Sequence, residues 1–345
     1  MNKYKLDEWI SKRKNRQSEL NFDTLYPQIL NGNTQALSSA ITLIESNNKS
    51  HDETCKKLVR ACLKNAGKSI RIGITGVPGV GKSTFIEAFG QYAIEKGHKV
   101  AVLAVDPSSE KSGGSILGDK TRMNDLSVHK NAFIRPSSAG KSLGGVARKT
   151  RESIILCEAA GFDYIIIETV GVGQSETVVH SMVDFFLLLM LAGAGDELQG
   201  IKRGIMEMAD GLVITKADSG NLNAAQKAKV QYQNAMHLFP PNKNEWTPQA
   251  LVSSAIDNIN IDKTYDMIES FKNHNKVNGW FNHNRKEQDK FWMHENINEQ
   301  LLNAFYANKT VLKKVKEFEK DVIEGKISSF EASDKLIELF YKERK

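Results

Sequence analysis

The spacing of hydrophobic residues divides the chain into three parts. In residues 1–68 apolar side chains recur at helical spacing, as at Leu25 and Ile29, which predicts three or four short helices. In residues 69–285 short apolar runs alternate with helix-like segments, a pattern typical of a mostly parallel sheet flanked by helices. Helical spacing returns in residues 286–345. We therefore expect an α/β domain between an N-terminal and a C-terminal helical extension.

Short apolar runs in the middle part have the length and composition of buried strands. Most are rich in β-branched residues and contain few polar ones, as strands buried on both faces do. The runs cover residues 70–75, 99–105, 163–168, 185–191, 212–214 and 251–252. Open α/β sheets bind ligands at the carboxyl ends of their strands, so the polar residues that follow these runs are candidate site residues.

The overall composition fits one large domain with additions. The chain has 345 residues, of which 40% are hydrophobic, and this is enough for a sizeable core. Its formal net charge is +6, and the charges near the N-terminus are of mixed sign. A solvated helical face explains that mixture better than nucleic-acid binding, so we expect no nucleic-acid partner.

Cysteine spacing and hydropathy indicate the cellular location of the protein. Cys55, Cys62 and Cys157 show no paired spacing, which argues against a disulfide framework and against a zinc site. The first residues are polar and charged and lack the apolar stretch of a signal peptide. A membrane-spanning helix needs a run of about 18 apolar residues, and the sequence contains none. The sequence therefore favours a cytoplasmic location without membrane contact.

A glycine-rich segment lies between the first predicted strand and a helix-like segment. It matches the phosphate-binding pattern G-x-x-x-x-G-K-[ST] in the required strand–loop–helix context. Backbone N–H groups of such a loop surround phosphate oxygens, and Lys82 adds positive charge at the β- and γ-phosphates. Ser83 would supply a hydroxyl oxygen to Mg²⁺. The sequence thus predicts a nucleoside triphosphate site formed by Gly76, Val77, Pro78, Gly79, Val80, Gly81, Lys82, Ser83 and Thr84.

Carboxylates follow two of the predicted strands. Asp106 comes directly after the run 99–105, where α/β sheets place their ligands. Glu168 ends the run 163–168 and is followed three residues later by Gly171. In phosphate-transferring enzymes this arrangement holds Mg²⁺ or its water through the carboxylate, and the Gly171 N–H would contact the γ-phosphate. The alternative is that Glu168 only caps the following turn.

Residues 113–145 contain three glycine-bearing segments and no clear strand. Long connections of this kind often carry function, so we expect a long mobile region, with an irregular surface loop as the alternative. A second glycine-rich segment, residues 192–203, follows the run 185–191 and contains Asp196, Glu197 and Lys202. Charged residues between glycines at this edge of a sheet suggest a switch that reports nucleotide state.

A Lys-x-Asp element, Lys216 to Asp218, follows the predicted strand 212–214. The Asp218 carboxylate can accept hydrogen bonds from both N1–H and the N2 amino group of guanine, and adenine offers no matching donor pair. A site built to hydrogen-bond a group rejects analogues that lack it, so Asp218 favours GTP over ATP. The stem of Lys216 would lie over the base.

Several of these segments together closely resemble the methylmalonyl-CoA mutase-associated GTPases, the MeaB/ArgK family of SIMIBI-class P-loop proteins. The resembling segments are residues 76–84, 105–109, 118–123, 168–176 and 195–202, within a match that spans residues 34–292. The resemblance implies a P-loop GTPase that acts as a chaperone of an adenosylcobalamin-dependent acyl-CoA mutase, most simply methylmalonyl-CoA mutase. Such proteins help to load the B12 cofactor and protect or reactivate the mutase.

The resemblance also implies roles for individual residues. Lys82, Asp106 and Glu168 would serve catalysis, and the metal set would be Ser83, Asp106, Asp119 and Glu168. Asp218 would read guanine, with Lys216, Ser254, Ala255 and Ile256 beside the base. Asp196, Glu197 and Lys202 would form a switch toward the mutase. The amphipathic C-terminal helices would form a homodimer arm, although packing on their own chain is the alternative.

Two residues depart from the family pattern. Thr215 stands where many relatives carry asparagine, and its shorter hydroxyl could weaken the brace between base site and P-loop. Ala192 replaces a common proline, which could make the start of the switch more flexible. The sequence shows no convincing arginine finger or catalytic glutamine, and Arg122, Arg135 and Arg148 are only candidates. We therefore expect slow intrinsic hydrolysis that the mutase accelerates.

Three other functions remain open at this point. A metallochaperone-type GTPase would share the core but should show Cys or His ligands at metal spacing. An ATP-using kinase would also share it, and Asp218 argues against that interpretation. A non-catalytic module, in which nucleotide binding matters but hydrolysis does not, is the third.

Overall fold

The structure is a computed structural model, and it describes residues 21–46, 48–105, 123–136, 143–169, 175–193, 203–218 and 220–343. These residues divide into two compact units, Met1–Gln288 and Asp289–Lys345. No helix in the described ranges is both long enough and apolar enough to cross a membrane.

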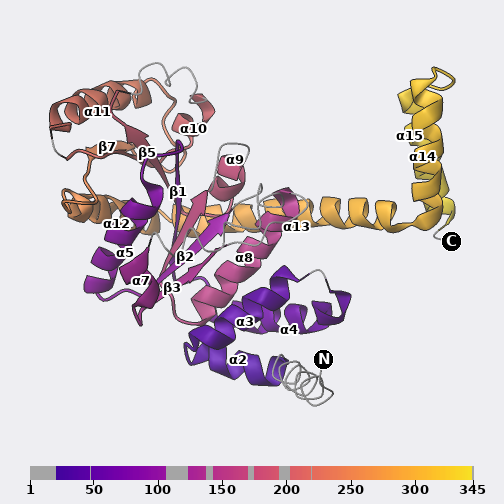
Figure 1. Cartoon of the computed structure of the whole chain (residues 1–345), viewed down its shortest axis with the longest axis horizontal. Coiled ribbons are helices and arrows are strands. Elements are labelled where there is room, and N and C mark those ends of the chain that lie inside the picture. The colour runs from indigo at the N-terminus through magenta and orange to yellow at the C-terminus, as the bar shows by residue number, and fades with distance from the viewer. Residues whose placement is uncertain are drawn as a thin grey trace, which may run out of the picture. The chain divides into compact units, whose positions relative to one another are not determined.

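The first unit is built on a seven-stranded sheet (Figure 1). Neighbouring strands pair in parallel in the order β3-β2-β4-β1-β5-β6-β7, so their carboxyl ends lie along one edge. The strands are β1 Ile70–Gly76, β2 Val100–Val105, β3 Ala132–Arg135, β4 Tyr164–Thr169, β5 Phe185–Leu191, β6 Gly211–Thr215 and β7 Gln249–Val252. The central strands are buried except at the last residues of β1 and β5, and most residues of β4 and β5 are aliphatic or aromatic, as expected for a sheet covered on both faces.

Helices cover both faces of this sheet. Figure 1 shows α5 and α12 on one side and α8 on the other. Phe85 and Phe89 of α5 and Phe271 of α12 belong to one hydrophobic cluster under the sheet, and Ala225 and Tyr232 of α11 belong to a second one. The bounds are α5 Lys82–Glu95, α7 Asn124–Val128, α8 Leu143–Ala159, α9 Ser175–His180, α10 Arg203–Glu207, α11 Leu222–Met236 and α12 Ile261–Val277.

The N-terminal extension forms the predicted helices. They are α2 Phe22–Leu30, α3 Thr34–Glu45 and α4 Asp52–Cys62, followed by a 3₁₀ turn at Leu63–Asn65. Two asparagines cap the first two: Asn21 accepts from the Thr24 N–H, and Asn33 accepts from the backbone N–H groups of Gln35 and Ala36. Cys62 is fully buried beside Leu58, in agreement with a packing role.

The region from residue 113 to 145 differs from the prediction. We expected one long mobile connection, but its described part contains α7, the edge strand β3 and the first turn of α8. Arg135 ends β3, where Leu103 of β2 pairs with it. β3 has only four residues before Pro136, too few for a recognisable alternation, and the long-range pairing with β2 determines its conformation.

An ionic cluster joins the amino ends of the central strands to α8 and α13. The guanidinium of Arg71, on β1, donates to both carboxylate oxygens of Glu158, on α8, at 3.0 and 3.1 Å. Arg285 donates to both oxygens of Asp184, which directly precedes β5, at 2.8 and 2.6 Å. All four side chains are almost entirely buried, and Arg285 also donates to the Gly67 and Ser69 carbonyl oxygens. The cluster therefore fixes the start of α13 to the edge of the sheet opposite the predicted nucleotide site.

The second unit is helical. α13 (Trp280–Ala307) continues into it, and α14 (Lys309–Ile323) and α15 (Ser329–Lys342) complete it. Asn308 and Ser328 cap the last two helices by accepting backbone N–H groups of Val311 and Glu331. Phe340 of α15 contacts Phe305 of α13, with 5.3 Å between ring centroids. Many apolar side chains of this unit stay exposed, including those of Ile297, Leu301, Leu302, Tyr306, Phe330, Ile337 and Tyr341.

Candidate functional site

The predicted phosphate loop connects the end of β1 with the start of α5. Gly79 and Gly81 have φ values of 78° and 91°, a left-handed conformation that favours glycine. At Gly76 a Cβ atom would lie 2.5 Å from the Leu189 carbonyl oxygen, so no side chain fits there. The glycines thus allow the loop to curl tightly against β5. The backbone N–H groups at the start of α5 are available for an anion.

The amine of Lys82 lies inside this loop. Its Nζ atom donates to the Gly76 carbonyl oxygen at 2.9 Å and approaches the Val77 carbonyl oxygen at 3.4 Å. Burial lowers the pKa of Lys82, although the charges of Glu168 and Glu176 act in the opposite direction. A phosphate group would offer this ammonium a stronger partner than two carbonyl oxygens, because the acceptor would then carry charge as well as the donor.

Ser83, at the start of α5, and Glu168, in β4, come together at the carboxyl end of the sheet. β1 and β4 pair in a register that aligns Ile74 with Glu168, and the carboxylate reaches across to α5. The Ser83 hydroxyl donates to Glu168 Oε1 at 3.4 Å, and Glu168 is only 3% exposed. A hydroxyl and a carboxylate oxygen beside a phosphate loop are ligands that suit Mg²⁺, which binds through one or two carboxylates plus phosphates.

The predicted base site forms where β6 and β7 end. Ser254 is fully buried and donates its hydroxyl to Asp218 Oδ2 at 3.2 Å, which fixes the orientation of the carboxylate. The Ala217 N–H donates to the Ser253 carbonyl oxygen at 3.2 Å, so the two segments are joined through their backbones as well. Ile256 is 75% exposed and stands at the surface of this site.

The base site and the phosphate loop adjoin each other. Lys216 adopts a left-handed conformation with φ of 56°, and its Cε atom would lie 3.8 Å from a Cβ atom at Gly81. The hydroxyl of Thr215 lies 2.7 Å from the carbonyl oxygen of Val80, within the loop. The shorter side chain at this position thus still contacts the P-loop.

Several predicted site residues lie outside the described ranges. They are Asp106, Asp119, Gly171, Asp196, Glu197 and Lys202, together with the arginine-finger candidate Arg122. The structure brings together the remaining ones around the ends of β1, β4, β6 and β7. In the part of the chain that the structure describes, no group of three or more His, Cys, Asp or Glu side chains could hold a metal ion by itself.

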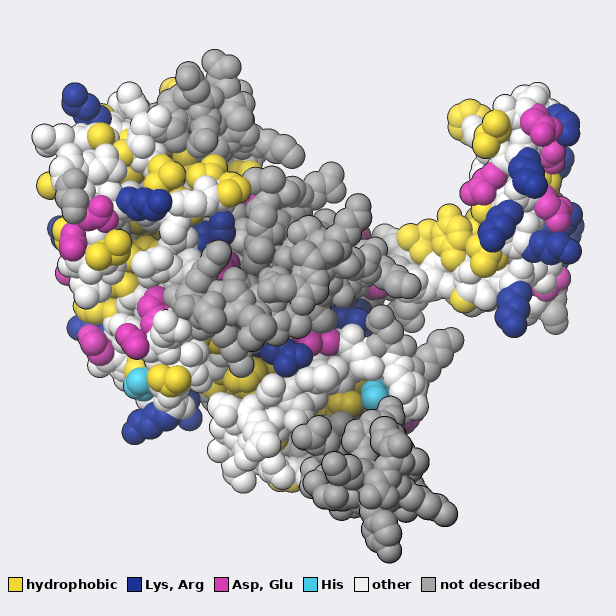
Figure 2. Space-filling view, in the orientation of Figure 1, with side chains coloured by type: hydrophobic (Ala, Val, Ile, Leu, Met, Phe, Trp, Pro, Cys, Tyr) yellow, Lys and Arg dark blue, Asp and Glu magenta, His cyan; other side chains and the backbone are white. Residues whose placement is uncertain are grey.

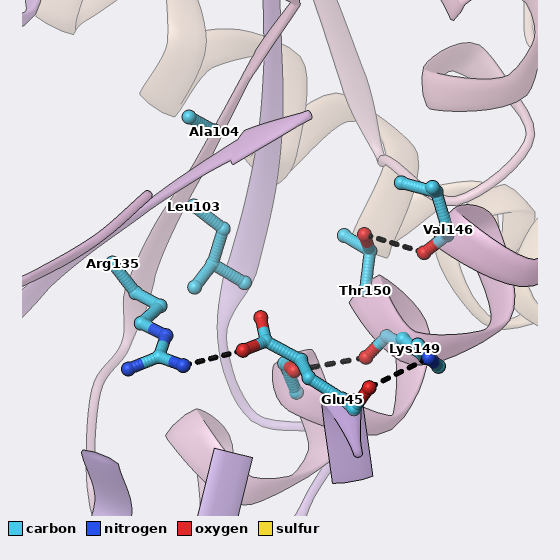
Figure 3. Close-up of a pocket in the computed structure, with 8 residues that line it drawn as sticks. Glu45, Leu103, Ala104, Arg135, Val146, Lys149 and Thr150 are labelled. Carbon is cyan, nitrogen blue, oxygen red and sulfur yellow. Dashed lines mark hydrogen bonds and ion pairs between the residues drawn. The ribbon is translucent and has the colours of Figure 1, made fainter. Parts of the chain in front are cut away.

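The other two arginine-finger candidates are engaged elsewhere. Arg135 forms an ion pair with Glu45 at the end of α3, and the amine of Lys149 donates to the Glu45 carbonyl oxygen (Figure 3). Arg148 pairs with Glu152 one helical turn away, at 3.1 Å. Arg135 therefore fastens the end of α3 to β3, and Lys149 fastens it to α8.

Two features of the site were not assigned a role from the sequence. Glu176, at the start of α9, is 7% exposed and close enough to Lys82 to influence its pKa. Thr75 and Thr169 place two buried hydroxyls 2.9 Å apart at the ends of β1 and β4. The only feature of the sequence that pointed to Glu176 was its place in segment 168–176, which resembles the family. The threonine pair depends on the register between β1 and β4, which the sequence does not show.

Comparison with known proteins decides the family. The family model described as "Methylmalonyl Co-A mutase-associated GTPase MeaB" matches residues 37–310. The chain belongs to the MeaB family. It is 49% identical over 321 residues to a protein of Caulobacter vibrioides named "Putative GTPase", covering 93% of this chain and 98% of that protein. It is 43% identical over 328 residues to the mouse "Methylmalonic aciduria type A homolog, mitochondrial", covering 92% of this chain and 79% of that protein.

A solved structure has a similar fold. The crystal structure of a protein titled "LAO/AO transport system kinase" superposes with a TM-score of 0.74 at 36% identity, covering 94% of this chain and 98% of that one. These relatives confirm the predicted P-loop α/β fold and identify the chain as a GTPase linked to methylmalonyl-CoA mutase. The guanine-specific interpretation of the nucleotide site agrees with that family.

Proposed function

We propose that this MeaB-family GTPase is a chaperone that couples GTP binding and hydrolysis to B12 cofactor loading and to protection or reactivation of methylmalonyl-CoA mutase. The observation that supports GTP as the nucleotide is Asp218, held by the Ser254 hydroxyl at 3.2 Å and placed beside the phosphate loop through Lys216. The family's association with the mutase supports the partner.

In the proposed mechanism the chain positions the phosphates and balances their charge. Ser83 and Glu168 would hold Mg²⁺ together with Asp106 and Asp119, and the bound ion would neutralise charge on the β- and γ-phosphates. Lys82 stabilises the charge that spreads over the γ-phosphate oxygens while water attacks in line. The Gly171 N–H would contact the γ-phosphate.

Hydrolysis by the isolated chain is expected to be slow. Arg135 and Arg148 are held in ion pairs with Glu45 and Glu152, so neither supplies positive charge to the γ-phosphate in this conformation. Arginine fingers contribute about 10³–10⁵-fold to hydrolysis in other GTPases. A partner that supplies or orders such a group would therefore accelerate turnover strongly.

The mutase is proposed to act through the segment with Asp196, Glu197 and Lys202. Lys202→Ala should preserve GDP binding and basal turnover but reduce the acceleration by the mutase. Unchanged mutase-stimulated turnover in this variant would show that the switch assignment is wrong.

We also propose that residues 69–285 are the GTPase domain and that residues 286–345 form a homodimer arm. The second unit exposes Leu301, Leu302 and Phe330, and Figure 2 shows hydrophobic side chains grouped on it. An apolar surface of this kind is typical of an interface. The double substitution Leu301→Glu/Leu302→Glu should then produce monomers in sedimentation velocity, whereas Lys313→Glu should not. A cytoplasmic location stays a prediction.

The deciding experiment is a hydrolysis assay with the purified full chain. GTP turnover is measured alone and with methylmalonyl-CoA mutase from the same source, with ATP as the control nucleotide. GTP-selective turnover that the mutase accelerates would support the proposal. Protection of the mutase that is equal with GTP and with a non-hydrolysable analogue would instead favour the non-catalytic module.

A further inference from the structure

Two buried hydroxyl groups meet between the strand that leads into the P-loop and the strand that carries Glu168. The Thr169 hydroxyl donates to the Thr75 hydroxyl oxygen at 2.9 Å. Thr75 is 2% exposed and Thr169 is 0% exposed. β1 and β4 are neighbours in the sheet, so this hydrogen bond joins the two strands at their carboxyl ends.

The stability of the sheet does not require these hydroxyls. β1 and β4 otherwise pack mainly isoleucines at their centres, and valine has nearly the same shape as threonine. A buried hydroxyl loses its hydration and gains only about 0.5–1.5 kcal/mol from a hydrogen bond. Replacing both partners by apolar groups of the same shape is often close to neutral. The pair therefore calls for a role other than holding the sheet together.

The position of the pair indicates such a role. Thr75 directly precedes Gly76, the first glycine of the P-loop, and Thr169 directly follows Glu168. The backbone pairing of β1 with β4 extends to Ile74 and Glu168. Thr75 and Thr169 lie one residue beyond it, and their hydrogen bond restricts movement of the two strand ends. Such movement would change the 3.4 Å separation between Ser83 Oγ and Glu168 Oε1. Mg²⁺ requires near-ideal octahedral geometry with ligands at about 2.0–2.1 Å, so its affinity is sensitive to small shifts of this kind.

We propose that Thr75 and Thr169 are positioning residues, and that their hydrogen bond sets the Mg²⁺ affinity of the nucleotide complex by holding Glu168 in place relative to Ser83. The proposal rests on Mg²⁺ binding by the GTPase as described above. Groups outside the direct ligands commonly change metal affinity by about 10–100-fold when they are removed.

The test separates positioning from stability with three variants of the full chain: Thr75→Val, Thr169→Val and the double variant. Release of fluorescently labelled GDP is measured over a series of Mg²⁺ concentrations and in EDTA, and urea unfolding is measured in parallel. Each single variant leaves one buried hydroxyl without its partner, so both should unfold at lower urea concentration. The double variant should regain most of that stability.

The Mg²⁺ dependence of GDP release should not recover in the double variant as stability does. All three variants should need about tenfold more Mg²⁺ to slow GDP release by half, while release in EDTA stays as in the wild type. Thr150→Val is the matched control, because Thr150 is also buried but bonds to the Val146 carbonyl oxygen within α8. It should leave the Mg²⁺ dependence unchanged.

Two results would overturn the proposal in distinguishable ways. If the wild type needs Mg²⁺ but the double variant needs no more of it, the threonine pair is structural only. If GDP release from the wild type does not depend on Mg²⁺ at all, the Mg²⁺ site itself is wrong and the positioning role fails with it.

Discussion

The hydroxyl of Thr215 donates a hydrogen bond to the carbonyl oxygen of Val80, with 2.7 Å between the two oxygens. Thr215 ends β6, directly before the residues that would read guanine, and Val80 lies in the P-loop. Thr215 is 5% exposed, so water does not replace this bond readily. The base site and the phosphate site therefore share one fixed connection through a side chain shorter than asparagine.

Removing that hydroxyl should loosen the loop. We expect Thr215→Val to lower the free energy of unfolding by about 1–3 kcal/mol, because the Val80 carbonyl oxygen stays buried without its donor. GDP affinity, measured by calorimetry, should fall about tenfold, since part of the binding energy is then spent on ordering the loop. Thr215→Ser keeps the hydroxyl and is the control. Equal GDP affinity of the two variants would show that the bond does not organise the site.

Nucleotide binding should be coupled to a proton on Lys82. Burial lowers the pKa of this amine from its ordinary value of 10.5, and a bound phosphate group would raise it again. The amine thus takes up a proton on binding at alkaline pH, and GDP affinity should fall as the pH rises through the lowered pKa. Calorimetry in two buffers of different ionisation enthalpy measures this uptake. The variant Lys82→Arg, whose guanidinium stays charged, should bind GDP without taking up a proton.

Absence of proton uptake by the wild type at alkaline pH would contradict this coupling. Lys82→Ala removes the charge altogether and should abolish detectable nucleotide binding or turnover.

The base preference should follow the carboxylate of Asp218. Asp218→Asn replaces one acceptor oxygen by an amino donor, which no longer matches the two donors of guanine but can donate to the C2 oxygen of xanthine. GDP affinity should drop by a factor on the order of 100 or more, and the affinity for XDP should rise. Competition binding against labelled GDP measures both. Ser254→Ala keeps the Asp218 carboxylate and removes the hydroxyl that donates to it and accepts from the Asp257 N–H, so the loss of GDP affinity should be much smaller.

A variant Asp218→Asn that still prefers GDP over XDP would place guanine recognition elsewhere in the site.

The ionic cluster at the opposite edge of the sheet should make stability depend on acid pH. Burial alone would raise the pKa of Glu158, but the Arg71 guanidinium and further hydrogen bonds hold it below its ordinary value of 4.5. A lowered carboxyl pKa contributes stability above pH 4.5, and that contribution is lost as the pH falls through the lower, folded-state pKa. Glu158→Gln leaves Arg71 buried without its charge partner. It should cost about 3–5 kcal/mol at pH 7.

Denaturant unfolding at pH 7 and at pH 3 checks the direction of this pH dependence of stability. The stability difference between wild type and Glu158→Gln should shrink at pH 3. Glu331→Gln, which breaks the exposed pair with Lys335, is the control and should change stability by less than about 1 kcal/mol at either pH. A difference that grows on acidification would contradict the assignment.

Local motifs made much of the fold and site predictable. The runs that became β1, β2, β4 and β5 are continuous and apolar, so each could be recognised without knowing its neighbours. The P-loop and the Lys216–Asp218 element are likewise contiguous in the chain. β3 could not be recognised, because four residues before a proline carry little periodicity and become a strand only by pairing with β2.

Contacts between distant segments account for the remaining differences. Ser254 donates to Asp218, and Thr215 to Val80, across the ends of separate strands. Thr75 meets Thr169 only because of the register between β1 and β4. The order of strands in a sheet is not encoded in the spacing of any single strand, so these relationships appear only in three dimensions.

The place of β1 in the sheet has a consequence for synthesis of the protein. β1 pairs with β4 and β5, and both follow it at a long distance in the chain. On the ribosome, the strand that leads into the P-loop therefore emerges with both edges unpaired, and it gains its two native neighbours only after Leu191 has been made. Such long-range parallel pairing is slow and leaves strand edges open to aggregation. Folding assisted by bound nucleotide is thus available only to chains already synthesised beyond β5.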